Sequence, residues 1–173
     1  MGIRVGAESA RVTIVEFADL ECPACRRLQN VMHEILRQPP QDVALVIVHT
    51  PLEGHRFAMQ AARVAECADA MGRFVAMTDA IFAKQDSLGT KSWGSFALDA
   101  GIADSASISA CASNTQPIDR ISAGKSLAEA LDITGTPTVF VNGWKFLGPS
   151  RQQLLRAIEA ARQGKAPGSV GAE

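Results

Sequence analysis

The sequence predicts an α/β protein in which a mixed β-sheet is flanked by helices and interrupted by an all-helical subdomain. Three observations lead to this prediction. The first fifty residues alternate strand, helix and strand, and the last forty form a β-hairpin followed by a helix. The residues between these two parts carry only helical patterns. At 173 residues the chain is long enough to bury a core without extra cross-links.

The first part begins with "RVTIVEFADL", where β-branched residues occupy both faces and indicate a strand buried on both sides, starting near Arg11. From Pro23 the apolar period changes to that of a helix, which the prolines of "RQPPQD" terminate. A second buried strand follows at 43–48. Two strands joined by one helix predict a right-handed parallel crossover. We assign residues 1–54 to this first half.

The middle of the chain, residues 55–131, is predicted to be a helical insertion. Two apolar stripes at helical spacing are separated near Gly72, and a loop follows at "QDSLGTKS". Shorter helices are expected at 93–100 and 105–112. Pro117 is suited to open a further helix that runs to about Leu131.

The last part, residues 132–165, returns to the sheet. Two short strands flank Asn142-Gly143, the strongest short signal for a hairpin. Ser150 is the expected N-cap of a closing helix whose apolar residues face inward. We expect the tail at 166–173 to be frayed.

Composition and charge exclude several functional classes. The formal net charge is −1 and no block of like charge appears, which argues against nucleic acid and anionic membranes as partners. No apolar run approaches the ~20 residues that span a bilayer. The N-terminus lacks the continuous apolar core of a signal peptide, as the mature form of an exported protein also would.

The stretch "CPAC" places two cysteines at the expected start of the first helix. Cys22 would lie at the helix N-terminus, where free N–H groups and the dipole favour a thiolate. Pro23 suits the first helical position, and Cys25 lies one turn further in. The spacing therefore predicts an activated nucleophile and a less exposed resolving partner that can form a disulfide.

Two other interpretations of the pair are a zinc half-site and a purely structural disulfide. Zinc needs a second pair of ligands at suitable spacing, but no Cys or His lies two to four residues from Cys67 or Cys111. A structural disulfide that closes so small a loop constrains little chain entropy. His33, His49 and His55 form no spaced cluster, and we expect them to be surface or packing residues.

Together, "VEF" before "CPAC" and "TGTPTVFVNG" more than a hundred residues later resemble the thioredoxin superfamily, over roughly residues 10 to 163. The helical insertion and "DSLG" resemble its bacterial DsbA-like branch. The resemblance implies a thioredoxin-like mixed sheet and a thiol–disulfide oxidoreductase. It also implies that the Thr136–Pro137 bond is cis, faces the cysteine pair, and binds an extended substrate peptide by strand addition.

The resemblance assigns roles to further residues. Thr136, Pro137 and the Pro23-Ala24 dipeptide are the implied substrate contacts. Glu16 interrupts an apolar strand, so burial would raise its pKa. DsbA-like proteins carry an acid at the matching position, and the resemblance implies that Glu16 exchanges a proton with Cys25. Glu21 is expected to be solvated. Strong oxidants of the family carry a histidine where this chain has Ala24, which donates no hydrogen bond to a thiolate.

Cys67 and Cys111 lie in the helical block and allow two interpretations. They are either separate buried thiols or a disulfide that staples the insertion, as in some members of the branch.

The predicted function is a thiol–disulfide oxidoreductase, most simply a dithiol oxidase that acts on reduced or unfolded exported proteins and is reoxidised by a membrane thiol oxidase. No metal or organic cofactor is expected, and the protein is expected to be an extracytoplasmic monomer whose signal segment is absent from this chain. The alternatives are a reductase or isomerase of the same fold, or a non-catalytic module that binds peptides or metal.

Overall fold

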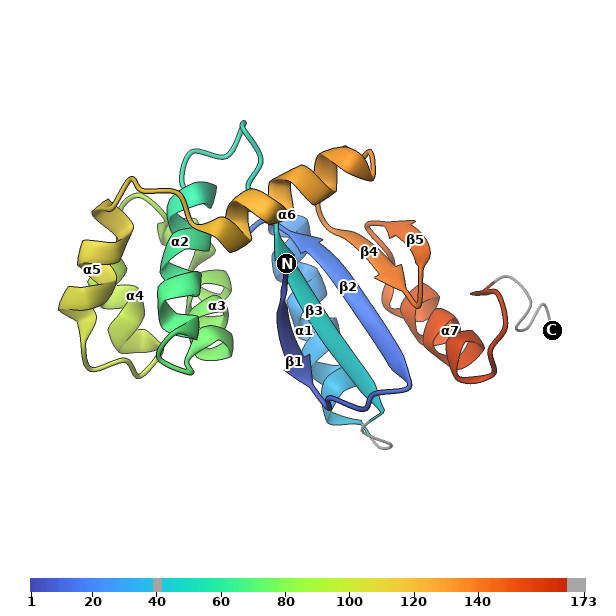
Figure 1. Ribbon diagram of the computed structural model, residues 1–173. Coiled ribbons are helices and arrows are strands. Elements are labelled where there is room, and N and C mark those ends of the chain that lie inside the picture. Colours follow the sequence, from blue (N-terminus) through green and yellow to red (C-terminus); the bar gives the residue numbers. More distant parts are fainter. Residues whose placement is uncertain (39–41, 168–173) are drawn as a thin grey trace.

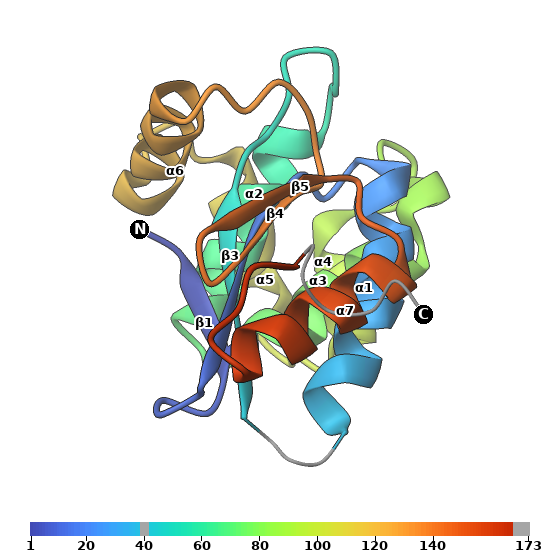
Figure 2. The same cartoon turned by 90° about the vertical axis from the view of Figure 1, so that its right-hand side faces the viewer.

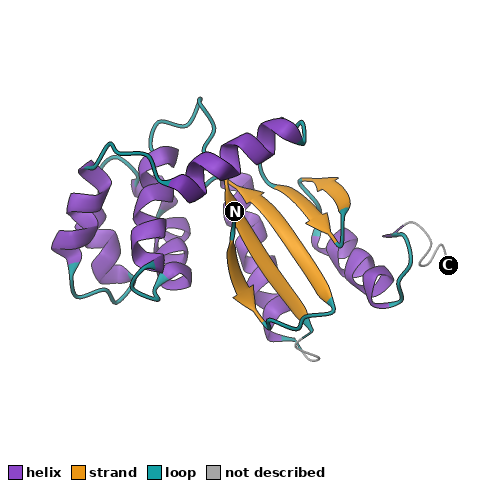
Figure 3. Cartoon of the chain, in the orientation of Figure 1, coloured by secondary structure: helices purple, strands orange, loops and turns teal. Residues whose placement is uncertain are grey.

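The structure is a computed structural model, and it describes residues 1–38 and 42–167. Within these residues the strands are β1 (Ile3–Gly6), β2 (Val12–Ala18), β3 (Val43–His49), β4 (Thr138–Val141) and β5 (Trp144–Leu147). The helices are α1 (Pro23–Arg37), α2 (Ala58–Asp69), α3 (Phe74–Ala83), α4 (Trp93–Asp99), α5 (Ser105–Ser113), α6 (Asp119–Ala130) and α7 (Arg151–Arg162), with a 3-10 turn η1 (Gln85–Ser87). Figure 3 shows their distribution along the chain. The predicted α/β class and inserted helices are confirmed.

The strands form one mixed sheet in the order β1-β3-β2-β4-β5. Strands β2 and β3 run parallel, and every other pair is antiparallel. The expectation that the first strand begins near Arg11 was wrong, because β1 precedes it and pairs with the edge of β3. A strand of four residues that ends in Gly6 leaves too short a pattern for periodicity to identify.

Helices cover both faces of the sheet. Figure 2 shows α1 and α7 on one face and α6 on the other. Along β2, Val12, Ile14 and Glu16 belong to the face of α1, while Phe17 packs in a second small core with Val48 and α6. This alternation directs the Glu16 carboxyl toward the helix that carries the cysteines.

Helix α1 begins and ends where the sequence predicts. Cys22 is its N-cap residue, Pro23 occupies the first helical position, and the last helical residue is Arg37. The prolines that were expected to stop the helix, at 39 and 40, lie outside the described residues. The residues that α1 buries follow one face and include Cys25, Leu28, Gln29, Met32 and Ile35.

Helices α2 to α5 form a separate bundle beside the sheet (Figure 1). Helix α6 leaves this bundle and crosses the sheet at the end of β3, beginning at Asp119, two residues after the predicted position. Gly124 makes the approach possible, since a Cβ there would lie 2.7 Å from the His49 carbonyl oxygen. The boundaries 55 and 131 that the sequence suggested for the insertion stay a prediction, and α6 itself packs on the sheet.

The end of the chain follows the predicted hairpin and helix. Asn142 and Gly143 turn between β4 and β5 with φ values of 44° and 92°. Ser150 caps α7 in a capping box with Gln153. The predicted frayed tail lies mostly outside the described residues. Among residues 1–38 and 42–167, no helix combines the length and apolar character that crossing a membrane requires.

Candidate active site

The two cysteines of "CPAC" lie at the amino end of α1 and are both reduced. Cys22 is 7% exposed and Cys25 is completely buried, so only Cys22 is open to attack by another molecule. Pro23 between them is exposed and Ala24 is half-buried. The arrangement has the asymmetry that the sequence predicts.

The segment before β4 closes over the pair. The Thr136–Pro137 peptide bond is cis, as the resemblance implies, and the Thr136 carbonyl oxygen lies 3.3 Å from the Cys22 sulfur, within hydrogen-bond distance of the protonated thiol. Residues 114 positions apart in the chain therefore meet at one sulfur atom. An extended peptide that pairs with Thr136 would place its own sulfur next to Cys22.

The surroundings of the two thiols shift their pKa values in opposite directions. Hydrogen bonding from the Cys25 thiol, with further contributions from the backbone N–H groups of Cys25 and Ala24, outweighs burial and lowers the pKa of Cys22 to about 5. The same hydrogen bond, together with burial and the nearby Glu16 carboxyl, raises the pKa of Cys25 far above that of a free thiol. At neutral pH Cys22 is therefore a thiolate and Cys25 a thiol.

Glu16 lies beneath the pair and is 2% exposed. Burial and the charge of the Cys22 thiolate raise its pKa to about 8. Within the described residues its Oε2 atom has no hydrogen-bond partner. A buried carboxyl that is protonated near neutral pH, with one oxygen free, is suited to hold a proton next to Cys25.

Comparison with known proteins identifies the family. A family model described as thioredoxin matches residues 1–160. The chain belongs to the thioredoxin family. The solved structure of Pseudomonas aeruginosa DsbA2 is 31% identical to this thioredoxin-family protein, covers 90% of its chain and 91% of DsbA2, and superposes with a TM-score of 0.70. The DsbA-like resemblance is thereby confirmed.

Other solved structures share the fold. A thioredoxin-like oxidoreductase from Silicibacter pomeroyi DSS-3 is 25% identical, with a TM-score of 0.78 over 94% of this chain and 92% of that one. BdbD from Bacillus subtilis, in its oxidised form, has a TM-score of 0.82 at 20% identity and covers 94% of both chains.

The curated relatives are much longer proteins. A protein of Mycolicibacterium gilvum named Na(+)/H(+) antiporter NhaA 1 is 36% identical over 160 residues, which is 91% of this chain and 26% of that protein. The thioredoxin-family chain thus spans about a quarter of the length of the curated relatives it matches.

A hollow lies beside the cysteines of this thioredoxin-family protein, between α1, Pro137 and the start of α7. Its volume is about 310 Å³, and its walls include Ala24, Arg27, Leu28 and Pro149. Two of the four predicted substrate contacts, Ala24 and Pro137, line this hollow. Ala24 follows Cys22 by two residues, and Pro137 adjoins the carbonyl group that contacts the Cys22 sulfur.

The sequence did not predict the residues that support the loop before Cys22. Asp19 is 1% exposed, and its carboxylate accepts hydrogen bonds from the backbone and from the His55 ring. Gln85 of η1 is buried and donates to the carbonyl oxygens of Leu20 and Cys22, at 2.9 and 3.1 Å. Glu21, expected to be solvated, is half-buried, and its Oε2 accepts a 2.6 Å hydrogen bond from the Phe57 N–H.

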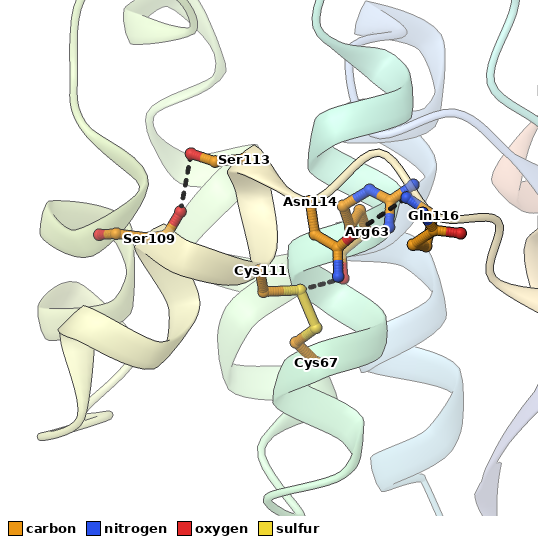
Figure 4. Close-up of a disulfide and its surroundings, with 7 residues drawn as sticks. All are labelled: Arg63, Cys67, Ser109, Cys111, Ser113, Asn114 and Gln116. Atoms are coloured by element: carbon orange, nitrogen blue, oxygen red, sulfur yellow. Dashed lines mark hydrogen bonds between the residues drawn. A yellow bond between two sulfur atoms is a disulfide. The ribbon is translucent and has the colours of Figure 1, made fainter.

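Of the two arrangements considered for the other cysteines, the structure has the disulfide. Cys67 of α2 and Cys111 of α5 are bonded, with Cα atoms 6.6 Å apart (Figure 4). The bond joins two helices of the bundle at a sequence separation of 44. Its position, which ties α2 to α5 within the bundle, is that of a structural disulfide.

The described residues contain no group of three or more His, Cys, Asp or Glu side chains arranged to hold a metal ion. The three histidines are dispersed. His33 of α1 is paired with Asp79 of the neighbouring helix α3, and His49 is buried against Glu66 and the Phe74 ring. His55, expected to be a surface or packing residue, instead contacts the Asp19 carboxylate.

Proposed function

We propose that the protein is a dithiol oxidase that transfers the Cys22–Cys25 disulfide to protein thiols. The observation that carries this proposal is the stabilised Cys22 thiolate at the N-cap of α1. A stable thiolate favours the reduced enzyme, and an enzyme that prefers its reduced form is an oxidant. At pH 7, about 2 pH units above the pKa of Cys22, ionisation stabilises the reduced form by about 2.7 kcal/mol, or about 60 mV.

The reaction proceeds by two exchanges. A substrate thiolate attacks the Cys22 sulfur of the oxidised enzyme, and the Cys22–Cys25 bond breaks as a mixed disulfide forms. Cys25 leaves as a thiolate and takes up a proton. A second substrate thiolate then attacks the substrate sulfur, which releases Cys22 as a thiolate and leaves the substrate disulfide-bonded. The substrate is oxidised by two electrons and the enzyme is reduced by two.

Glu16 supplies the proton in this proposal. The thiolate that leaves at Cys25 is fully buried, where a charge is costly, and the nearby carboxyl is protonated near neutral pH. Transfer of that proton to Cys25 speeds the first exchange in the oxidising direction. In the reverse direction Glu16 removes the proton so that Cys25 can resolve a mixed disulfide.

The proposed substrates are reduced or unfolded exported proteins, which bind in extended form at Thr136 and Pro137 with side chains in the adjacent hollow. A membrane thiol oxidase would reoxidise the pair, and no nucleic acid takes part. An extracytoplasmic location is supported by the Cys67–Cys111 disulfide, since such bonds persist in oxidising compartments. One similar structure is described as a periplasmic thioredoxin-like protein from Salmonella enterica serovar Typhimurium.

A redox titration against glutathione tests the direction of the reaction. We expect a potential between about −120 mV, typical of a strong oxidant, and about −270 mV, typical of a thioredoxin-type reductant. Ala24→His should raise it by some tens of millivolts, because an imidazole there can donate to the Cys22 thiolate. The wild type should also oxidise a reduced dithiol peptide, and Cys22→Ser should not. A potential at or below the thioredoxin value would instead assign the protein as a reductase.

A further inference from the structure

Two acidic residues in the loop before Cys22 are held by the segment that leads into α2. We call residues 19–21 the acidic loop. The Asp19 carboxylate accepts hydrogen bonds from the Leu52 N–H and from His55 Nδ1, both at 2.8 Å. Phe57 N–H donates to Glu21 at 2.6 Å. Three short hydrogen bonds therefore connect the acidic loop to residues 52–57.

The acidic loop in turn contacts both cysteines. The Cys22 N–H donates a 3.1 Å hydrogen bond to the Asp19 carbonyl oxygen. The Asp19 backbone also hydrogen-bonds to the Cys25 sulfur and acts to lower the pKa of that thiol. Any shift of Asp19 would thus move the N-cap of α1 and alter the surroundings of both sulfur atoms.

His55 is a titratable side chain that contacts this loop directly. Its ring is 28% exposed, so it exchanges protons with water, while its partner carboxylate on Asp19 is completely buried. Burial opposes the protonated form, but the hydrogen bond and charge of Asp19 together with the charges of Glu21 and the Cys22 thiolate outweigh it and raise the pKa of His55. The groups that face His55 are thus two carboxylates of the acidic loop and one thiolate of α1.

We propose that His55 is a positioning residue that fixes the acidic loop and offsets its negative charge, so that reduction of Cys22–Cys25 is coupled to protonation of His55. Oxidation of two substrate thiols releases two electrons and two protons. The electrons cleave the Cys22–Cys25 bond, and one proton reaches the Cys25 thiolate by way of Glu16, which is then reprotonated. The Cys22 thiolate stays unprotonated, and the second proton is shared between His55 and solvent. The redox step rests on the proposed function, whereas the charge coupling does not.

The first test measures this coupling in the wild type. The His55 ring proton resonances are followed by NMR across the pH range, once with the oxidised and once with the reduced protein. We expect the imidazole to titrate at higher pH in the reduced protein, because only that state holds the Cys22 thiolate. His33, whose carboxylate partner is Asp79 of α3, is the control, and its ring resonances at a fixed pH should be the same in the oxidised and the reduced protein. Equal titration of His55 in both states would overturn the proposal.

The second test uses variants. His55→Asn keeps an N–H donor for Asp19 but carries no charge, His55→Ala removes both, and His33→Asn is the matched control. Near the pH where half of Cys22 is ionised, the ultraviolet absorbance of the thiolate should report a thiolate-to-thiol ratio about threefold lower in His55→Asn. The equilibrium constant for reduction by glutathione should fall by a similar factor at pH 6 and return to the wild-type value above pH 8.

Values for His55→Asn that match the wild type and His33→Asn at every pH would overturn the proposal. A loss that is the same at all pH values would reduce His55 to a structural contact and would also overturn it. If His55→Ala does not fold, the wild-type NMR titration and His55→Asn still decide the question. Neither titration needs a protein substrate, so failure of the wild type to oxidise a dithiol peptide would reject the proposed function alone.

Discussion

Substitution of Glu16 by Gln should change the stability of the protein by an amount that depends on pH, and the variant should gain on the wild type as pH rises from 4 to 7. The protonated carboxyl is preferred in the folded state, where its pKa is about 8, against 4.5 for an ordinary glutamate. The stability that this preference provides is complete below pH 4.5 and is lost as pH rises toward 8, because the unfolded chain ionises first. Glutamine does not titrate and escapes this loss.

The size of the effect follows from the interval between the two pKa values. At pH 7 the unfolded carboxyl is about 2.5 pH units above its pKa while the folded one is still mostly protonated, and each unit is worth about 1.4 kcal/mol. The free energy of unfolding of Glu16→Gln, relative to wild type, should therefore rise by roughly 3 kcal/mol between pH 4 and pH 7. The free-energy cost of burying the glutamine amide is the same at pH 4 and at pH 7, so it cancels from this difference.

The assay is urea unfolding followed by circular dichroism at pH 4, 5.5, 7 and 8, with all proteins in the same redox state. Glu8→Gln is the control, because Glu8 is an exposed acid outside the sheet. The rise should be smaller in the oxidised protein, which lacks the Cys22 thiolate that helps to raise the pKa of Glu16. A difference between Glu16→Gln and wild type that stays constant across this range would refute the assignment of Glu16 as a protonated buried acid.

Three further predictions concern the cysteines and α6. Iodoacetamide at pH 6 should alkylate Cys22 of the reduced protein well before Cys25, as mass spectrometry of peptides can show, and preferential labelling of Cys25 would reverse their roles. Cys67→Ala with Cys111→Ala should lower stability to thermal unfolding by about 3–4 kcal/mol but keep peptide oxidation, so a loss of turnover at temperatures where the variant is folded would contradict a structural role. Gly124→Ala should cost about 1–3 kcal/mol in urea unfolding, because its Cβ would meet a β3 carbonyl at 2.7 Å, and an unchanged midpoint would show that α6 can move away freely.

Local patterns were enough to predict most elements and the central pair of the site. Helix α1 has a proline at its first position and one apolar face, and the hairpin has Asn142-Gly143, so each carries its own signal. The burial of Glu16 follows from its place inside an apolar strand. Cys22 and Cys25 are neighbours along a helix, so their contact needs no tertiary information.

The rest depends on contacts between distant segments, which no local pattern encodes. Asp19 and Glu21 are ordinary acidic residues in sequence, and only the fold brings His55 and Phe57 to them. The Cys67–Cys111 bond likewise depends on how α2 packs on α5, which sequence spacing leaves open. Strand β1 was missed for a different reason, since it is too short to show a period.

The hydrogen bonds of Gln85 have a consequence for how such proteins diversify. The amide of this one side chain, which lies in the helical insertion, serves two carbonyl groups at the start of α1, so the insertion forms part of the wall of the redox centre. A chimera that combined this sheet with the helical block of a relative would leave those carbonyls without their donor unless a matching amide stood in the same place. The sheet part and the helical insertion are therefore constrained to change together. Recombination at their junctions should give a working protein only when the Gln85 amide and the loop before Cys22 come from the same parent.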